Sequence, residues 1–269
     1  TDMITSSNNA KVKQVVQWQT KAKERRKDHV FLAEGIRMCE EAPVKGVKEV
    51  YLTEELEQKL RQNAQNGDTA FWDKLQQTGY ETVSPEVFAK MADTQTPQGI
   101  LTVLEQPSYD LAQLLEQPDP LFLILENLQD PGNLGTMIRT GEGAGITGVI
   151  MNGQTVDIFN PKTIRATMGS IFRVPFVYVP ELSPVLTQMH EKGIHTYAAH
   201  LKGKEYYDSF SFREPTAFLI GNEGNGLTKE ISDQSGQYLK IPMEGKVESL
   251  NASIAAALLM YEAHRQRNL

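Results

Sequence analysis

The chain of 269 residues contains one cysteine, Cys39, and no apolar run long enough to cross a membrane. A single cysteine excludes an internal disulfide and argues against a thiolate metal site. The five histidines are scattered, without the spacing of metal ligands. No basic start followed by an apolar core opens the sequence, so nothing indicates secretion. We therefore expect a cytoplasmic protein that binds no metal ion.

An excess of positive charge is also absent: 27 Lys and Arg stand against 34 Asp and Glu, for a net charge of −7. Overall charge therefore cannot attract the phosphate backbone of a nucleic acid. Residues 11–27 are a local exception, with seven basic residues and the single acid Glu24. Such a run is often only the solvated face of a helix. The alternative is RNA contact through Lys21, Lys23, Arg25 and Arg26, and the family resemblance given below favours it.

Proline divides the sequence into two parts. Residues 106–120 carry three of the 13 prolines on both sides of one short helical stretch. We predict an N-terminal domain over residues 1–105, a linker over 106–120 and a C-terminal domain over 121–269.

Both parts alternate between helical and strand patterns. The N-terminal part predicts a helix over residues 7–26, with Val12, Val15, Val16 and Gln19 on its buried face. Strands are expected after it at 30–35, 49–53, 80–84 and 99–105. In the C-terminal part, strands are expected at 121–127, 148–152, 174–179, 195–200, 217–223 and 239–243. The fold class is α/β, and the C-terminal sheet should be mainly parallel with helices on both faces.

One dinucleotide-binding pattern is misleading. Residues 143–148 spell G-x-G-x-x-G, which binds dinucleotides where it follows a strand and opens a helix. Here it ends a helix and leads into a strand, so the glycines indicate a helix end and a turn.

Three segments of the C-terminal half each join an expected strand to a loop of glycine, asparagine and one or two charged residues. They are residues 125–151, 218–227 and 241–263. Loops of this kind lie at the carboxyl ends of strands in open α/β sheets, where ligands usually bind. The sequence therefore predicts one site that gathers one arginine, one glutamate and several asparagines.

The order and the residues of these segments resemble those of the SpoU (TrmH-like) family of RNA ribose 2'-O-methyltransferases, within the SPOUT superfamily. The motif N-x-G-x-x-x-R matches Asn133, Gly135 and Arg139, and G-x-E-x-x-G-L matches residues 221–227. The third motif, I-P-M followed by S-L-N and an alanine-rich helix, begins at Ile241. Three spaced motifs rarely coincide by chance.

The N-terminal part matches more loosely. It resembles the small ribosomal-protein-like RNA-binding domain that often precedes the catalytic domain in this family. The sequence TPQGI at residues 96–100 adds to this likeness.

The resemblance implies a fold, a cofactor and partners. The C-terminal sheet is expected to contain a deep trefoil knot, which sequence patterns alone would never suggest because knots are very rare. The expected cofactor is S-adenosylmethionine, and the expected partners are RNA and a second copy of the chain, through the catalytic domain. The expected cofactor-binding residues are Gly221, Ile241, Ser249, Leu250 and Asn251.

The resemblance also implies four catalytic residues: Asn133, Arg139, Glu223 and Asn251. In the family the arginine activates the hydroxyl group. Because a guanidinium with a pKa above about 12 is a poor proton acceptor, we expect Arg139 to stabilise the developing alkoxide or to grip a phosphate. The alternative is an ordinary ion pair with Glu142 or Glu126.

The other three residues have structural alternatives as well. Glu223 either holds Asn133 or Arg139 and offsets a sulfonium charge, or it complements the dipole of a helix that starts near Thr228. Asn251 and Ser249 precede a helix and would cap it in any protein. Asn133 lies in D-P-G-N, an ordinary turn sequence.

The final helix, expected over residues 253–264, is apolar nearly all round. It is either core or a dimer interface. The predicted function is methylation of a ribose 2'-hydroxyl in ribosomal RNA, with transfer RNA as the alternative substrate. An RNA-binding module without catalysis and a small-molecule methyltransferase are the alternatives; the intact motif residues disfavour the first, and the basic segment with the extra domain disfavours the second.

Overall fold

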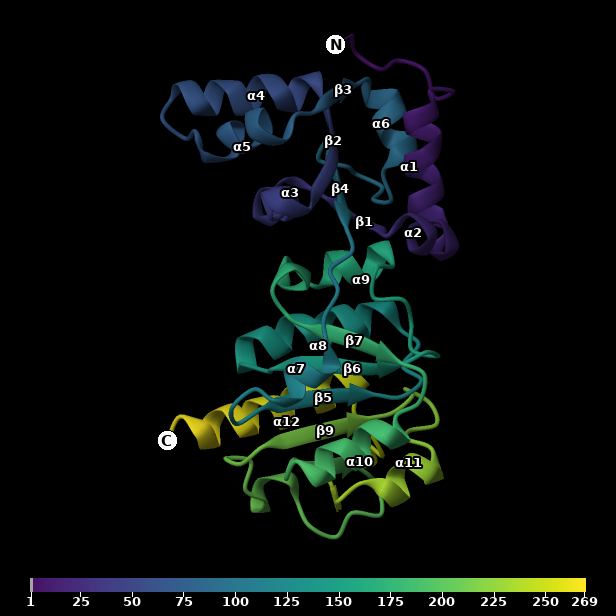
Figure 1. Ribbon diagram of the computed structural model, residues 1–269, viewed down its shortest axis with the longest axis vertical. Coiled ribbons are helices and arrows are strands. Elements are labelled where there is room, and N and C mark those ends of the chain that lie inside the picture. Colours follow the sequence, from purple (N-terminus) through teal and green to yellow (C-terminus); the bar gives the residue numbers. More distant parts are fainter. Residues whose placement is uncertain (1) are drawn as a thin grey trace. The chain divides into compact units, whose positions relative to one another are not determined.

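The computed structural model describes residues 2–269, which form two compact units (Figure 1). The first unit runs to Pro107 and also includes Phe159–Phe172. The second comprises Ser108–Ile158 and Arg173–Leu269. The chain therefore passes between the units three times. The segment Phe159–Phe172 departs from the sequence pattern, which assigned it to the C-terminal domain, because Phe159 and Phe172 pack against Phe31.

The first unit is built on a four-stranded sheet of order β1-β4-β2-β3. β4 runs antiparallel to β1 and β2, and β3 pairs parallel with β2, so the carboxyl ends of β1, β2 and β3 lie at one edge. The strands agree with the sequence pattern to within two residues. They are β1 (Val30–Glu34), β2 (Val47–Thr53), β3 (Glu81–Val83) and β4 (Ile100–Glu105).

Helices cover both faces of this sheet. Apolar side chains of α1 and α6 form a core with one face, and those of α3, α4 and α5 form a core with the other. The helical segments of the unit are α1 (Ala10–Thr20), α2 (Ala22–Asp28), α3 (Ile36–Glu41), η1 (Val44–Gly46), α4 (Glu54–Gln65), α5 (Ala70–Thr78), α6 (Pro85–Met91), α9 (Pro161–Ala166) and η2 (Ser170–Phe172).

The single helix predicted over residues 7–26 is wrong, because the chain is extended at Lys21 and forms two helices. The Arg25 side chain stabilises the break between α1 and α2. This side chain is 4% exposed, and its Nη1 atom donates to the main-chain oxygen of Trp18 at 2.7 Å, near the end of α1. A carbonyl that has lost its helical partner is thereby satisfied. Trp18 is buried on this face, whereas Val16 is only half-buried.

The second unit contains a six-stranded sheet of order β10-β8-β9-β5-β6-β7, in which every pairing is parallel. The predicted parallel sheet is confirmed. The strand expected over 239–243 is displaced, because regular pairing stops before Pro242, which has no N–H for a ladder. The strands are β5 (Leu121–Leu125), β6 (Gly148–Asn152), β7 (Phe176–Val179), β8 (His195–Ala199), β9 (Thr216–Ile220) and β10 (Gln237–Leu239).

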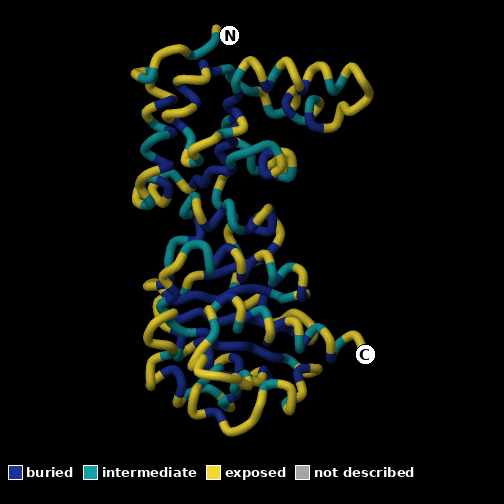
Figure 2. Tube along the Cα trace, turned by 180° about the vertical axis from the view of Figure 1, so that it is seen from behind, coloured by how far each residue is buried: buried dark blue, intermediate teal, exposed yellow. Residues whose placement is uncertain are grey.

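Both faces of the large sheet are covered, so its central strands are buried throughout (Figure 2). Side chains such as Phe122, Ile124 and Leu219 pack with α7, α10 and α11. The alternate side chains point to the opposite face, where α12 packs on β9 and on α8. The helical segments are α7 (Leu111–Leu115), α8 (Pro131–Ala144), α10 (Ser183–Glu191), η3 (Tyr207–Ser209), α11 (Lys229–Gln234) and α12 (Ala252–Arg267).

The strand order places a crevice at one point of the sheet. After β5 the chain continues to β6 and β7 on one side, and the later strands β8, β9 and β10 lie on the other. β5 and β9 are neighbours, so the order reverses between them. Ligands of open α/β sheets bind outside the carboxyl ends of strands at such a reversal. Among residues 2–269, none of the helices combines the length and apolar character that crossing a bilayer requires.

The role of Arg25 gives a stability prediction. Arg25→Ala should lower the free energy of unfolding of the first unit by about 2–3 kcal/mol, because a buried, charge-assisted hydrogen bond is lost. Both tryptophans, Trp18 and Trp72, belong to this unit, so their fluorescence during urea unfolding reports on it. The matched control is the exposed neighbour Arg26→Ala, which should change stability by less than about 0.5 kcal/mol. Equal losses in both variants would contradict this account.

Candidate active site

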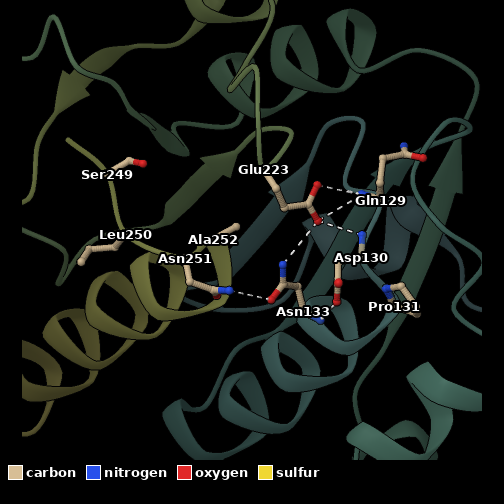
Figure 3. A pocket seen from close by; sticks show the side chains of 9 residues that line it. All are labelled: Gln129, Asp130, Pro131, Asn133, Glu223, Ser249, Leu250, Asn251 and Ala252. Carbon is tan, nitrogen blue, oxygen red and sulfur yellow. Dashed lines mark hydrogen bonds between the residues drawn. The ribbon is translucent and has the colours of Figure 1, made fainter. Parts of the chain in front are cut away.

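A pocket lies at the crevice beyond β5 and β9. Its volume is about 620 Å³, and it collects residues from the loop after β5, the loop after β9 and the start of α12 (Figure 3). The three sequence segments singled out above therefore meet in one place. The lining residues are Gln129, Asp130, Pro131, Asn133, Glu223, Ser249, Leu250, Asn251 and Ala252.

Glu223 connects the loop after β9 to the loop after β5. Its carboxylate accepts main-chain N–H groups of Gln129 at 3.0 Å and Asp130 at 2.8 Å (Figure 3). Partial burial alone would raise the pKa of Glu223, but these N–H groups, with the amide of Asn133, lower it below its usual range. Hydrogen bonds to the charged form have this effect. The carboxylate is therefore ionised at neutral pH.

Asn133 stands between two other site residues. Its Nδ2 donates to Glu223 at 3.4 Å, and its Oδ1 accepts from Nδ2 of Asn251 at 3.1 Å (Figure 3). The three side chains form one hydrogen-bonded series that joins all three motif segments. Asn133 uses a donor and an acceptor within the series, and Asn251 uses its donor there and its acceptor on the N–H of Ser253, so the orientation of both asparagine side chains is fixed.

The sequence offered a helix-capping role for Asn251 and a helix-dipole role for Glu223 as alternatives to a place in the site. Asn251 caps α12, its Oδ1 accepting the N–H of Ser253 at 2.8 Å, and it also contacts Asn133, so capping and a place in the pocket coexist. Glu223 does not lie at the N-terminus of the helix that begins after Thr228. Instead Thr228 caps that helix and is held by Glu126, which accepts its N–H at 2.7 Å.

Comparison with known proteins identifies the family of this chain. Residues 120–261 match the model of the SpoU rRNA Methylase family, and residues 9–102 match the MRM3-like substrate binding domain. The chain belongs to the SpoU rRNA methylase family. It is 34% identical, over 96% of its length and 97% of the relative's, to the 23S rRNA (guanosine(2553)-2'-O)-methyltransferase RlmP of Bacillus subtilis.

Two solved structures of SpoU-like proteins cover nearly the whole chain. One is an AdoMet-bound rRNA methyltransferase from Sinorhizobium meliloti, with a TM-score of 0.85, 29% identity, and coverage of 98% of this chain and 97% of that one. The other is the SpoU methyltransferase AviRb from Streptomyces viridochromogenes with AdoMet, with a TM-score of 0.82, 27% identity, and coverage of 97% and 99%. The α/β architecture with a parallel sheet and a separate N-terminal domain is thus the architecture of SpoU methyltransferases.

Of the five residues that the SpoU motifs led us to expect at the cofactor, three line the pocket and two lie outside its lining. Ser249, Leu250 and Asn251 line the pocket, whereas Gly221 and Ile241 do not. Gly221 has a structural reason to be glycine. A Cβ atom there would lie 2.2 Å from main-chain atoms of Gly226 and Leu227, because the loop after β9 folds back on itself. A bulky residue at 221 would therefore disrupt the loop before any ligand is considered.

Arg139 of the first SpoU motif does not line the pocket. It is exposed on α8, and no hydrogen bond or ion pair of its side chain occurs among the described residues. The two acids that were the alternative ion-pair partners of Arg139 bind other residues: Glu142 binds Arg173, and Glu126 binds Thr228. Arg139 and Gly143 share one face of α8, and the Tyr261 hydroxyl of α12 lies against Gly143.

Of the four basic residues expected to contact RNA, three are exposed and one is buried. Lys21, Lys23 and Arg26 are exposed around α2. Arg25 departs from the prediction, because its guanidinium is buried against α1. The charge run could not reveal this, since it does not show which basic side chain faces inward.

The sequence did not predict four of the lining residues, Gln129, Asp130, Pro131 and Ala252, and the first two of these contact Glu223. Gln129 and Asp130 offer main-chain N–H groups to Glu223, and Asp130 also caps α8 by accepting the N–H of Asn133 at 2.8 Å. An aspartate followed by Pro131 is a recognisable helix start, so the cap was readable, although its partner Glu223 was not. Within residues 2–269 no three His, Cys, Asp or Glu side chains gather as a metal site.

The lowered pKa of Glu223 gives a prediction about pH. A carboxylate with a depressed pKa in the folded state contributes stability above its unfolded value of about 4.3, and this contribution is lost as pH falls through the folded pKa. The amide NMR signals of Gln129 and Asp130 should therefore shift together, with a midpoint below about 4.3. Glu223→Gln should abolish this shift, and Glu244→Gln, a control on another exposed loop, should leave it intact. A midpoint above 4.3, or persistence in Glu223→Gln, would show that another group is responsible.

Proposed function

We propose that this protein transfers a methyl group from S-adenosylmethionine to a ribose 2'-hydroxyl of ribosomal RNA. The observation that carries this proposal is the Glu223–Asn133–Asn251 series, which brings three SpoU motifs to one pocket at the strand-order reversal. The full-length relative is named as a 23S rRNA 2'-O-methyltransferase, which favours ribosomal over transfer RNA. The cytoplasmic location expected from the sequence belongs to the same proposal.

The pocket suits the proposed cofactor. Its volume falls within the range of about 300–1,000 Å³ that small-molecule sites occupy. Leu250 offers an apolar contact and Ser249 a hydroxyl group, while the ionised Glu223 complements a positive sulfonium. When bound, S-adenosylmethionine supplies the electrophilic methyl group. We assign its binding to Ser249, Leu250 and Asn251, with Gly221 and Ile241 shaping the adjoining loops.

We also propose the trefoil knot that the family resemblance implies. Its support is the path of the chain after β10. That strand is at the edge of the sheet, yet α12 packs against β9 and α8 in the middle. The intervening residues 240–251 form no regular structure and must return across the strand ends.

In the proposed reaction the hydroxyl oxygen bonds to the methyl carbon, the carbon–sulfur bond breaks, and the hydroxyl proton passes to solvent water. Glu223 already accepts three donors, so its role is to hold Asn133 and the loop after β5, not to accept that proton. A guanidinium group donates hydrogen bonds and has no acceptor atom, so Arg139 is not the acceptor either. We assign to Arg139 the stabilisation of negative charge on the oxygen or the grip on the adjacent phosphate.

We propose that the chain divides this work between two domains, expected at residues 1–105 and 121–269, with the segment Phe159–Phe172 belonging to the first unit. The N-terminal domain binds the substrate RNA, and its match to a substrate binding domain supports this assignment. On its surface Lys21, Lys23 and Arg26 are exposed cations that can neutralise phosphates despite the acidic composition of the chain.

We propose in addition that two copies associate through α12. Ile254, Leu258 and Tyr261 are 51%, 37% and 45% exposed and are spaced at i, i+4 and i+7, so they form one apolar stripe. Since Tyr261 lies against Gly143 and Arg139 shares the face of Gly143, Arg139 stands beside this stripe. A second copy seated on the stripe would surround Arg139, whose charge no group of its own chain neutralises among the described residues.

The proposed function predicts the behaviour of Arg139 variants. Arg139→Ala should reduce single-turnover methylation of ribosomal RNA by about a hundred- to a thousand-fold, because one well-placed stabilising group is lost. Arg139→Lys should recover only part, since an ammonium lacks the planar two-pronged contact. Affinity for S-adenosylmethionine, measured by calorimetry, should stay within about two-fold, because Arg139 is outside the pocket. Thr136→Ala, an exposed site one turn earlier, is the control, and full activity of Arg139→Ala would remove this residue from the mechanism.

The proposed dimer predicts a change in mass. Leu258→Asp should convert a dimer to a monomer in sedimentation experiments, because a charge is placed in the middle of the apolar stripe. Leu201→Asp changes an 80% exposed leucine outside α12 and should leave the mass unchanged. A monomeric parent protein, or a Leu258→Asp variant that remains dimeric, would contradict an interface on α12.

A further inference from the structure

A second pocket lies in the first unit, at the edge where β1, β2 and β3 end. Its volume is about 420 Å³, within the range of small-molecule sites. The loop that closes it belongs to the TPQGI sequence, for which the proposed reaction gives no role. The lining residues are Ile36, Thr53, Glu55, Leu56, Lys59, Pro85, Phe88, Pro97, Gln98 and Gly99.

The backbone around this pocket is shaped to keep it open. Gly99 has a φ of +92°, and a Cβ atom there would lie 2.7 Å from the hydroxyl of Thr53. Gly35 has a φ of +97°, and a Cβ atom there would lie 3.0 Å from Oε1 of Gln98. Both positions therefore require glycine for conformation and for space.

Gln98 is held in one orientation. Its Oε1 accepts the main-chain N–H of Ile36 at 2.7 Å. An N–H donor needs an oxygen acceptor, so the Nε2 group must be the end of the side chain that is not bound to Ile36. Among the described residues Nε2 has no hydrogen-bond partner. Gln98 lines the pocket, and its two N–H donors are thus available to a ligand.

The rest of the lining selects the kind of ligand. Ile36, Pro85 and Pro97 are half-buried or exposed and provide apolar surface suited to a flat ring. Glu55 supplies a carboxylate, which only accepts hydrogen bonds when ionised. The other charged lining residue is Lys59, so the lining holds one charge of each sign.

We propose that this pocket takes one guanine base of the substrate RNA, unstacked from its neighbours. Guanine offers O6 as an acceptor for the Gln98 amide, and N1–H and N2–H as adjacent donors for the two oxygens of Glu55. Uracil offers only one such donor, and adenine lacks the carbonyl oxygen. Proteins read single-stranded RNA through such splayed bases and their Watson–Crick edges. The inference rests on the proposed RNA substrate and adds a base-specific contact in the substrate-binding domain.

The test uses the full-length protein and fluorescent seven-nucleotide RNAs in an anisotropy titration. One RNA has a single guanosine at its centre, one has inosine there, and one contains only uridine. The guanosine RNA should bind at least about ten-fold more tightly than the uridine RNA, as a paired contact to a base edge confers. Inosine lacks the N2 amine and should fall between them. Equal affinity for all three would overturn the proposal.

Matched variants locate the contact. Gln98→Glu keeps an acceptor for Ile36 but replaces the two donors, and Glu55→Gln removes one acceptor; each should abolish the preference for guanosine. The controls carry the same changes on neighbouring exposed residues outside the pocket, Gln95→Glu and Glu54→Gln, and should retain the preference. Retention of the preference in Gln98→Glu, or its loss in both controls as well, would overturn the assignment to this pocket. Unchanged thermal unfolding confirms that each variant is folded.

This test is separate from the test of methyl transfer. A protein that methylates ribosomal RNA but binds the three short RNAs equally retains the proposed function and loses the guanine site. A protein that transfers no methyl group but prefers guanosine through Gln98 and Glu55 keeps the site and loses the enzyme assignment.

Discussion

The interaction on which the active-site pocket depends is the set of hydrogen bonds received by the Glu223 carboxylate. Glu223 follows β9, and its donors follow β5, so one charged group joins two loops that are 90 or more residues apart in sequence. The main-chain N–H groups it accepts belong to Gln129 and Asp130, the two residues that immediately precede α8. Without this anion, Asn133 would lose its connection to the loop after β9, and the series that ends at Asn251 would have no fixed orientation.

The parallel sheet explains why these residues meet at all. Because the strand order reverses between β5 and β9, the loops after these strands separate to opposite faces and leave a crevice. The chain fills the far wall of the crevice with the start of α12, which is capped by the residue that also contacts Asn133. In the first unit, three parallel strands end at one edge in the same way and frame the pocket beside Gln98.

The sequence predicted the strands, the parallel sheet and the gathering of Asn133, Glu223 and Asn251, since these follow from local apolar patterns and spaced motifs. It did not predict that α1 ends before Lys21, because the cause is a contact between the Arg25 side chain and a carbonyl oxygen seven residues away. It could not separate Arg25 from its exposed neighbours for the same reason. Gly221 was expected to admit a ligand, yet the nearest obstacle to a side chain is the main chain of its own loop. Such distinctions depend on which side chain turns inward, and a motif does not carry that information.

The central claim is that methyl transfer ends on a ribose 2'-oxygen of ribosomal RNA. The most direct measurement incubates the protein with S-adenosylmethionine bearing a deuterated methyl group and with ribosomal and transfer RNA from cells that lack the gene. Nucleosides are then analysed by mass spectrometry after complete digestion, and the modified position is mapped by partial digestion. The account predicts a deuterated 2'-O-methyl nucleoside at a single position of ribosomal RNA. A label on a base, a label in transfer RNA instead, or no label in any RNA would contradict it.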